Sequence, residues 1–156
     1  ISQIDDSLSE VVKDMLNALQ GSINAIDNAE LMKNINQARD AHKNWMNVLK
    51  KIVDEMKVYP IQVNGEKCAF GHFYHSIKIN HPEVKEYWDA IDSVHSELHG
   101  FGHMVIQAVK DNDSDKAKEY YEEAAELSKQ VLEKLGKVLE KIEELDKKGI
   151  QILKQM

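Results

Sequence analysis

The sequence predicts an all-α protein, an antiparallel four-helix bundle with extended, coiled-coil-like terminal helices. Only seven Gly and two Pro occur in 156 residues, and both prolines lie in the middle third of the chain. The long stretches without these residues are rich in Lys, Glu, Leu and Ala, which favour helix. Within them apolar residues recur every three or four positions, as in helices with one buried face. Short connections between such helices imply antiparallel neighbours.

Two helices are predicted in the N-terminal third, over residues 5–20 and 27–56. We expect Gly21 and Ser22 to weaken the helix between them, because glycine lowers helix stability. The second helix should end before Pro60, since the residue preceding a proline avoids helical geometry. The first helix carries one apolar stripe, formed by Ile4, Leu8, Val11, Met15 and Leu19.

The middle of the chain is predicted to contain a loop, a short helix and a long helix. Residues 60–67 have the composition of a loop, and a short helix is expected over residues 69–79. A long helix should cover residues 83–110, with Pro82 in its first turn. This part of the chain therefore changes direction twice before the long helix begins.

The last helix is expected to begin near residue 115 and to run toward the C-terminus. Its apolar residues follow the 4-3-4-3 spacing of a coiled-coil seam: Val131, Leu135, Val138, Ile142 and Leu145. We therefore divide the chain into an N-terminal helix (1–22), a helical core (23–112) and a C-terminal helix (113–156). The terminal apolar stripes suit either core packing, or a dimer seam or linker to another domain.

Composition and charge exclude several classes of partner. The net charge of −7 argues against binding to nucleic acid or to anionic lipid, both of which require a basic surface. No apolar run approaches the ~20 residues needed to cross a bilayer, and no signal segment opens the chain. The lone cysteine, Cys68, cannot form an internal disulfide, which suits the reducing cytoplasm. The first residue is Ile rather than Met, which suggests a piece of a longer protein.

Histidine is the informative residue type, since all seven lie between positions 42 and 103. His95 and His99 are four residues apart, so their imidazoles share one helix face and can reach one zinc ion. His103 continues this face and is the substitute ligand, and Asp92 is one turn away and could orient an imidazole. The zinc-protease pattern does not fit, because Glu97 stands two residues after the first histidine instead of one.

Two further candidates come from other segments of the chain. His42 lies on the inner side of the second predicted helix, and Cys68 opens the short helix, where a thiolate gains from the helix N-terminus. Alone, each residue type is more often part of the core than a metal ligand. One thiolate and three imidazoles together suit tetrahedral zinc, and a bundle core can bring them together. We therefore predict four metal ligands: His42, Cys68, His95 and His99.

Three separated motifs resemble the signature of the chemoreceptor zinc-binding (CZB) domain. They are His42-x-x-Trp45, Cys68-x-Phe70-Gly71-x-Phe73-Tyr74 and His95-x-x-Leu98-His99. The resemblance covers roughly residues 35–110, and Phe73 stands where the family commonly has Trp. It implies a four-helix bundle, often homodimeric, that binds zinc through the same four residues. It also implies attachment to a bacterial chemoreceptor or diguanylate cyclase, and a role in sensing zinc or oxidants.

The remaining histidines and the tryptophans receive structural interpretations. We expect His72 and His75 to be exposed beside the short helix, and His81 to belong to the cap of the following helix. Trp45 and Trp88 are predicted to be core anchors.

The sequence thus predicts a zinc-dependent sensor domain rather than an enzyme. A site with four protein ligands leaves no open position for water, which is the layout of a structural metal. Loss of zinc, or oxidation of Cys68, would then alter helix packing. Two alternatives remain: a hemerythrin-like di-iron bundle that binds oxygen, and a metal-free helical interaction domain.

Overall fold

The computed structural model describes the backbone of residues 2–153 and the side chains of residues 9–19 and 27–153. This part of the chain forms four α-helices and no β-strand longer than an isolated bridge, which confirms the all-α class. The helices are α1 (Ser2–Glu55), α2 (Ala69–Ser76), α3 (Pro82–Lys110) and α4 (Ser114–Lys147). None of the described helices combines the length and apolar character that crossing a membrane requires.

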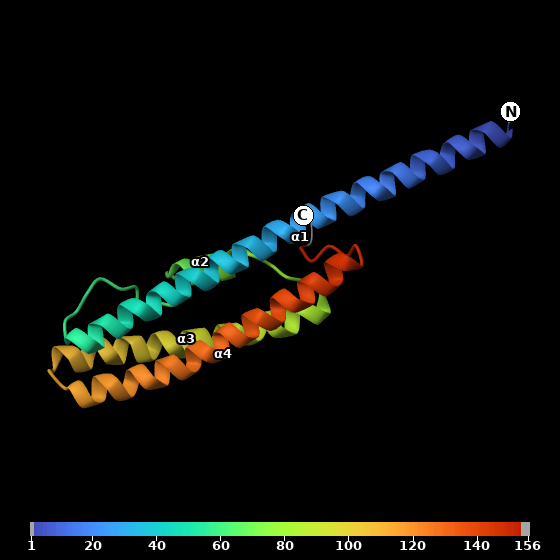
Figure 1. Cartoon of the computed structure of the whole chain (residues 1–156). Helices are drawn as coiled ribbons and strands as arrows, with labels where there is room; N and C mark the ends of the chain where they lie inside the picture. Colours follow the sequence, from blue (N-terminus) through green and yellow to red (C-terminus); the bar gives the residue numbers. More distant parts are fainter. Residues whose placement is uncertain (1, 154–156) are drawn as a thin grey trace.

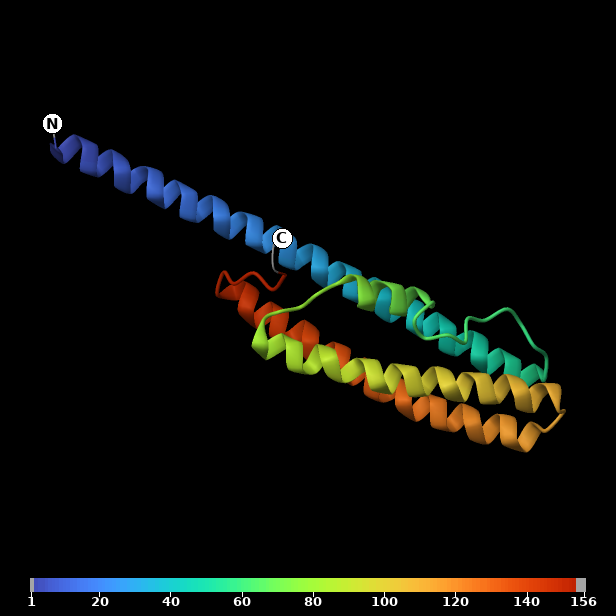
Figure 2. The same cartoon turned by 180° about the vertical axis from the view of Figure 1, so that it is seen from behind.

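The helices form an elongated bundle from which one end of α1 projects. α1 and α3 run in the same direction, whereas α4 and the short α2 run the opposite way (Figures 1 and 2). The most extensive packing joins α3 to α4, while α1 packs on α4, α2 and α3. The bundle therefore consists of three long helices, and α2 occupies the fourth position only where it lies along α1.

The predicted separation of two N-terminal helices is wrong, because α1 is continuous from Ser2 to Glu55. A glycine inside a helix costs about 1 kcal/mol relative to alanine, which weakens the helix without ending it. No proline occurs in this stretch. The side chains of Ile4, Leu8 and Ser22 lie outside the described side chains. The described members of the predicted stripe are exposed, so they do not belong to the core of this chain.

The last helix ends at Lys147 rather than running on toward the C-terminus. Gly149 adopts a φ of 72°, which turns the chain out of the helix. The following segment is fastened to α1 by the buried Asn28, whose Nδ2 donates to the carbonyl of Ile150 (2.7 Å). Its Oδ1 accepts from the backbone N–H of Ile152 (3.1 Å). The tail thus closes the end of the bundle nearest to the projecting part of α1.

The predicted seam of α4 is confirmed as the centre of the core. All of its members are almost inaccessible to solvent: Val131, Leu135, Val138, Ile142 and Leu145. One apolar cluster forms around Phe70, Trp88 and this seam, and a second forms around Leu49, Leu98 and Val105. Three histidines are buried in the same core, and they belong to the candidate site.

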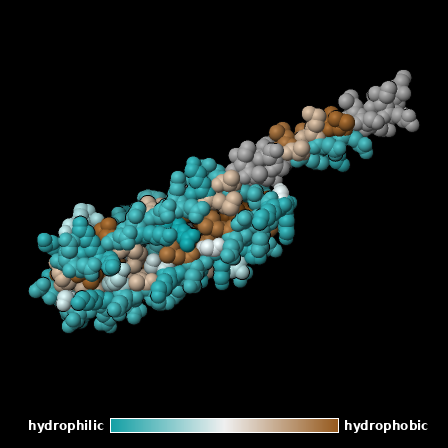
Figure 3. Space-filling view, in the orientation of Figure 1, coloured by the Kyte–Doolittle hydropathy of each residue, from teal (hydrophilic) through white to brown (hydrophobic). Residues whose placement is uncertain are grey.

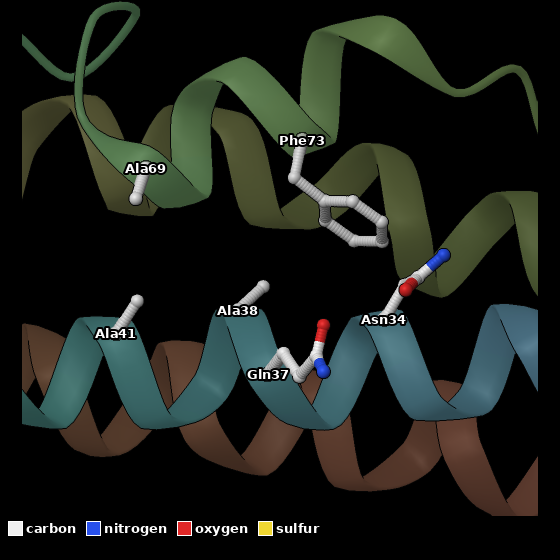
Figure 4. A pocket seen from close by; sticks show the side chains of 6 residues that line it. All are labelled: Asn34, Gln37, Ala38, Ala41, Ala69 and Phe73. Carbon is white, nitrogen blue, oxygen red and sulfur yellow. The ribbon is translucent and has the colours of Figure 1, made fainter.

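Small side chains allow α2 to lie close to α1. Figure 4 shows the pocket between these helices, where Ala38 and Ala41 of α1 face Ala69 and Phe73 of α2. Phe73 is partly buried and packs against the core, with its ring 6.1 Å from that of Trp88. An aromatic ring therefore packs against the core at this position with Phe in place of Trp. This contact carries Cys68, at the start of α2, toward the interior of the bundle.

Candidate metal centre

α3 contributes two imidazoles that point toward the same place. His95 and His99 lie one turn apart on the buried face of the helix, and each is 3% exposed. Their Nε2 atoms are 3.2 Å apart. The spacing of four residues therefore places both potential ligand atoms together, as predicted from the sequence.

Cys68 brings a thiol to the same point from the start of α2. It is the N-cap residue of this helix, and its Sγ accepts a hydrogen bond from the backbone N–H of Gly71 (3.1 Å). The same Sγ lies 3.5 Å from Nε2 of His95. Because the capping geometry aims the side chain back over the first turn, it also fixes the position of the sulfur.

The separations of these atoms match those expected around one tetrahedral zinc ion. Zinc–nitrogen distances near 2.0–2.1 Å and a zinc–sulfur distance near 2.3 Å place two nitrogens about 3.3 Å apart. They place a nitrogen and a sulfur about 3.6 Å apart. The measured values are 3.2 Å for His95 and His99 and 3.5 Å for His95 and Cys68. All three ligand atoms lie within 4.8 Å of one another, so the residues fit a shared metal ion.

His42, the fourth predicted ligand, lies beside this group but is not part of it. It is 2% exposed, and its ring centre is 6.3 Å from that of His95. Its Nε2 forms a 2.8 Å hydrogen bond with Oγ of Ser128 on α4. It nevertheless lines the same cavity, of about 170 Å³, as Cys68 and His99. The structure thus brings three of the four residues into contact, and the role of His42 stays a prediction.

Burial keeps the three imidazoles neutral at physiological pH. Burial, together with repulsion from the protonated form of His99, lowers the pKa of His42 to about 4. Burial, together with repulsion from the protonated forms of His99 and His42, lowers the pKa of His95 to about 3. It also lowers the pKa of His99 to about 4, which backbone groups of Gln62 and Val63 partly oppose. A neutral imidazole is the form that binds a metal ion.

The thiol of Cys68 behaves differently from the sequence-based expectation. Burial raises its pKa, and this outweighs the lowering by backbone hydrogen bonds from Gly71 and Phe70 at the helix N-terminus. The free thiol is therefore protonated at neutral pH, and binding of a metal ion would release its proton.

Trp45 links the site to the loop that precedes α2. Its ring centre lies 4.5 Å from that of His99, and its Nε1 donates to the carbonyl of Gln62 (2.8 Å). Gly102 makes room for this ring, because a Cβ there would come within 2.7 Å of it. The Nδ1 atom of His99 is buried without a hydrogen-bond partner. Trp45, predicted only as a core anchor, therefore also forms one wall of the site.

The other predicted residues lie away from the cluster. His103 is exposed, so it is not the substitute ligand, because the buried face of α3 beyond His99 continues through Gly102 and Val105 and leaves His103 outside it. Asp92 forms an ion pair with His75 (3.6 Å between Oδ1 and Nε2) rather than orienting a buried imidazole. His72 and His75 are exposed, and His81 is the N-cap residue of α3, as expected.

Ser128, which contacts His42 from α4, was not among the predicted site residues. The signal was present in the spacing of the α4 seam. Ser128 lies four residues after the buried Ala124 and three before the buried Val131, so it occupies a core position. A hydroxyl at such a position requires a partner, because an unpaired buried polar group is costly.

An all-α bundle with a buried group of one thiol and two imidazoles defines a helical domain compatible with metal binding. Residues 42–106 match the family model of the chemoreceptor zinc-binding domain, which confirms the resemblance predicted from the motifs. The matched segment begins at His42 and includes the other three predicted ligands. Comparisons with curated proteins and with solved structures gave no significant match.

Proposed function

We propose that this chain is a zinc-binding sensor domain of a bacterial signalling protein. In this proposal His42, Cys68, His95 and His99 hold one Zn²⁺. The observation that supports it best is the separation of the buried Sγ and Nε2 atoms, which is that of ligands around one tetrahedral ion. The matched family is a zinc-binding domain of the regulatory kind, which supports a sensor rather than an enzyme.

The ligands come from three helices, and this placement suggests how a signal arises. When bound, zinc supplies a structural cross-link with no open position for substrate. Cys68 then holds α2 to the pair of histidines on α3, and His42 adds α1. Loss of the metal, or oxidation of the Cys68 thiolate, frees α2 and changes the packing of α1. We propose that α1 and α4 pass this change to an attached module such as a chemoreceptor or diguanylate cyclase.

The first prediction concerns metal content. Protein purified from a cytoplasmic expression without added metal should contain about one zinc ion per chain and be colourless. Stripping the ion with a strong chelator should lower the melting temperature by about 10 °C, because ligand present at ~1,000 times its Kd stabilises by about 4 kcal/mol. Elemental analysis and thermal melting measure both quantities.

Two other outcomes would contradict the proposal. A coloured protein containing two iron ions would favour the hemerythrin-like alternative. The described cluster argues against that alternative, because it consists of a thiol and two imidazoles without a carboxylate. A protein that contains no metal and melts identically with and without chelator would favour the plain interaction bundle.

We further propose that the projecting part of α1 pairs with a second copy of the chain. Five apolar residues there are between 48% and 67% exposed: Val11, Val12, Met15, Leu16 and Leu19. They occupy an arc of about 140° around the helix, and Figure 3 shows hydrophobic side chains along one side of this projection. Since the stripe contains no charge, a twofold-related copy would place no like charges in opposition.

A substitution at the centre of this stripe tests the pairing. Met15→Asp should convert the dimer to a monomer, because the stripe would then bury an unpaired carboxylate in each copy. Asn17→Asp adds the same charge on the opposite face of the helix and should remain dimeric. Sedimentation equilibrium measures both masses. A wild-type chain that is monomeric at all concentrations, or a dimeric Met15→Asp variant, would refute the pairing.

A further inference from the structure

Ser128 is a polar residue at a core position of α4, and its hydroxyl meets a candidate ligand. It is 7% exposed, between the fully buried Ala124 and Val131. Its Oγ lies 2.8 Å from Nε2 of His42, which is 86 residues away in the sequence. A serine at such a position makes fewer apolar contacts than a larger apolar residue would. The hydrogen bond to His42 offsets the free energy lost in this way.

This hydrogen bond determines which nitrogen of His42 is available. A neutral imidazole carries one N–H donor and one lone pair, and they reside on different nitrogens. If Nε2 donates its proton to Oγ of Ser128, the lone pair lies on Nδ1. Histidines that bind metals almost always donate their other ring N–H to an oxygen, which fixes the tautomer and the ring orientation. Ser128 occupies the place of that oxygen.

The position of His42 agrees with this arrangement. Its ring lines the cavity that Cys68, His95 and His99 also line, while its Nε2 is engaged on the side of α4. Its ring centre is 6.3 Å from that of His95, so His42 would have to move closer to the other three residues to share an ion with them. The ring therefore bridges α4 and the metal cavity.

We propose that Ser128 is a positioning residue that holds His42 as the Nε2–H tautomer and so presents Nδ1 as the fourth ligand atom. This inference rests on the proposed zinc site and extends it to α4. That helix supplies none of the predicted ligands, yet through Ser128 it contacts one of them. Binding of zinc would therefore restrain the position of α4 as well as the positions of the three helices that carry the ligands.

The test compares Ser128→Ala with Ser128→Thr. Loss of the hydroxyl should weaken zinc binding by about 10- to 100-fold, the usual effect of removing such a partner. Threonine keeps the hydroxyl and should restore the affinity to within a few-fold of the wild type. Ser93→Ala, at an exposed position of α3, is the control and should bind as the wild type does. Competition with a chromophoric chelator measures the affinities, and circular dichroism checks the fold of each metal-free variant.

The second readout is the tautomer of His42. Nitrogen NMR of the imidazoles should show Nε2–H in the metal-free wild type, and Nδ1 bound to the metal after addition of zinc. A zinc-loaded wild type in which Nε2 of His42 is the ligand would overturn the inference, as would a Ser128→Ala variant with undiminished affinity. In those cases zinc still binds and the proposed function stands. A wild type that binds no zinc would overturn both.

Discussion

The Cys68→Ser variant is expected to bind zinc about 100-fold more weakly than the wild type. Structural zinc sites contribute about 10–16 kcal/mol of apparent binding free energy. An equal share for each of four ligands is about 3 kcal/mol, which corresponds to about 100-fold in affinity. A serine hydroxyl does not replace a thiolate at neutral pH. Competition with a chelator of known affinity measures the change.

The same substitution should leave the metal-free fold intact, which separates the loss of a ligand from unfolding. Serine is among the preferred N-cap residues, so it can accept the backbone N–H of Gly71 in place of Sγ. The metal-free variant should therefore melt close to the metal-free wild type. His72→Ala changes an exposed histidine of the same helix and should leave affinity unchanged. A Cys68→Ser variant with the wild-type zinc content and response to chelation would refute the proposed site.

The elements most readily predicted were those with strong local signals. Pro60 and Pro82 bound the segment that contains α2, and the start of α3 falls at the second of them. Asp113 caps α4 through a hydrogen bond from the backbone N–H of Lys116 (3.1 Å). Gly21 gave a weaker signal. The free energy lost at a single glycine is smaller than the cost of starting a new helix beyond it, so α1 continues through Gly21.

The candidate site was predictable to the extent that its geometry is local. His95 and His99 meet because a helix repeats every 3.6 residues, and Cys68 is fixed by its own capping hydrogen bond. The contacts of His42 with Ser128 and of Trp45 with Gln62 were not predictable. They depend on how α1 packs against α4 and against the loop between α1 and α2. That register is set by packing of the whole core rather than by spacing in the sequence.

Gly71→Ala is expected to destabilise the metal-free chain by about 3 kcal/mol or more, at the upper end of the cost of overfilling a packed interior. Gly71 is buried in the first turn of α2, and an added methyl group would overlap the carbonyl oxygen of Gly65. The carbonyl belongs to the backbone and the position of a Cβ is fixed by its own backbone, so neither group can rotate away. Equilibrium unfolding in urea measures the change in the free energy of unfolding.

The same overlap should disturb the site, because the turn at Gly65 lies over it. A Cβ at Gly65 would itself come within 3.3 Å of the ring of His99, and the thiol of Cys68 lies 3.3 Å from the Gly65 carbonyl. Gly136→Ala is the matched control, since a Cβ there meets no atom within 4 Å. That change should stabilise α4 by about 1 kcal/mol, because alanine favours helix over glycine. Equal effects of the two substitutions would show that α2 does not press against this turn.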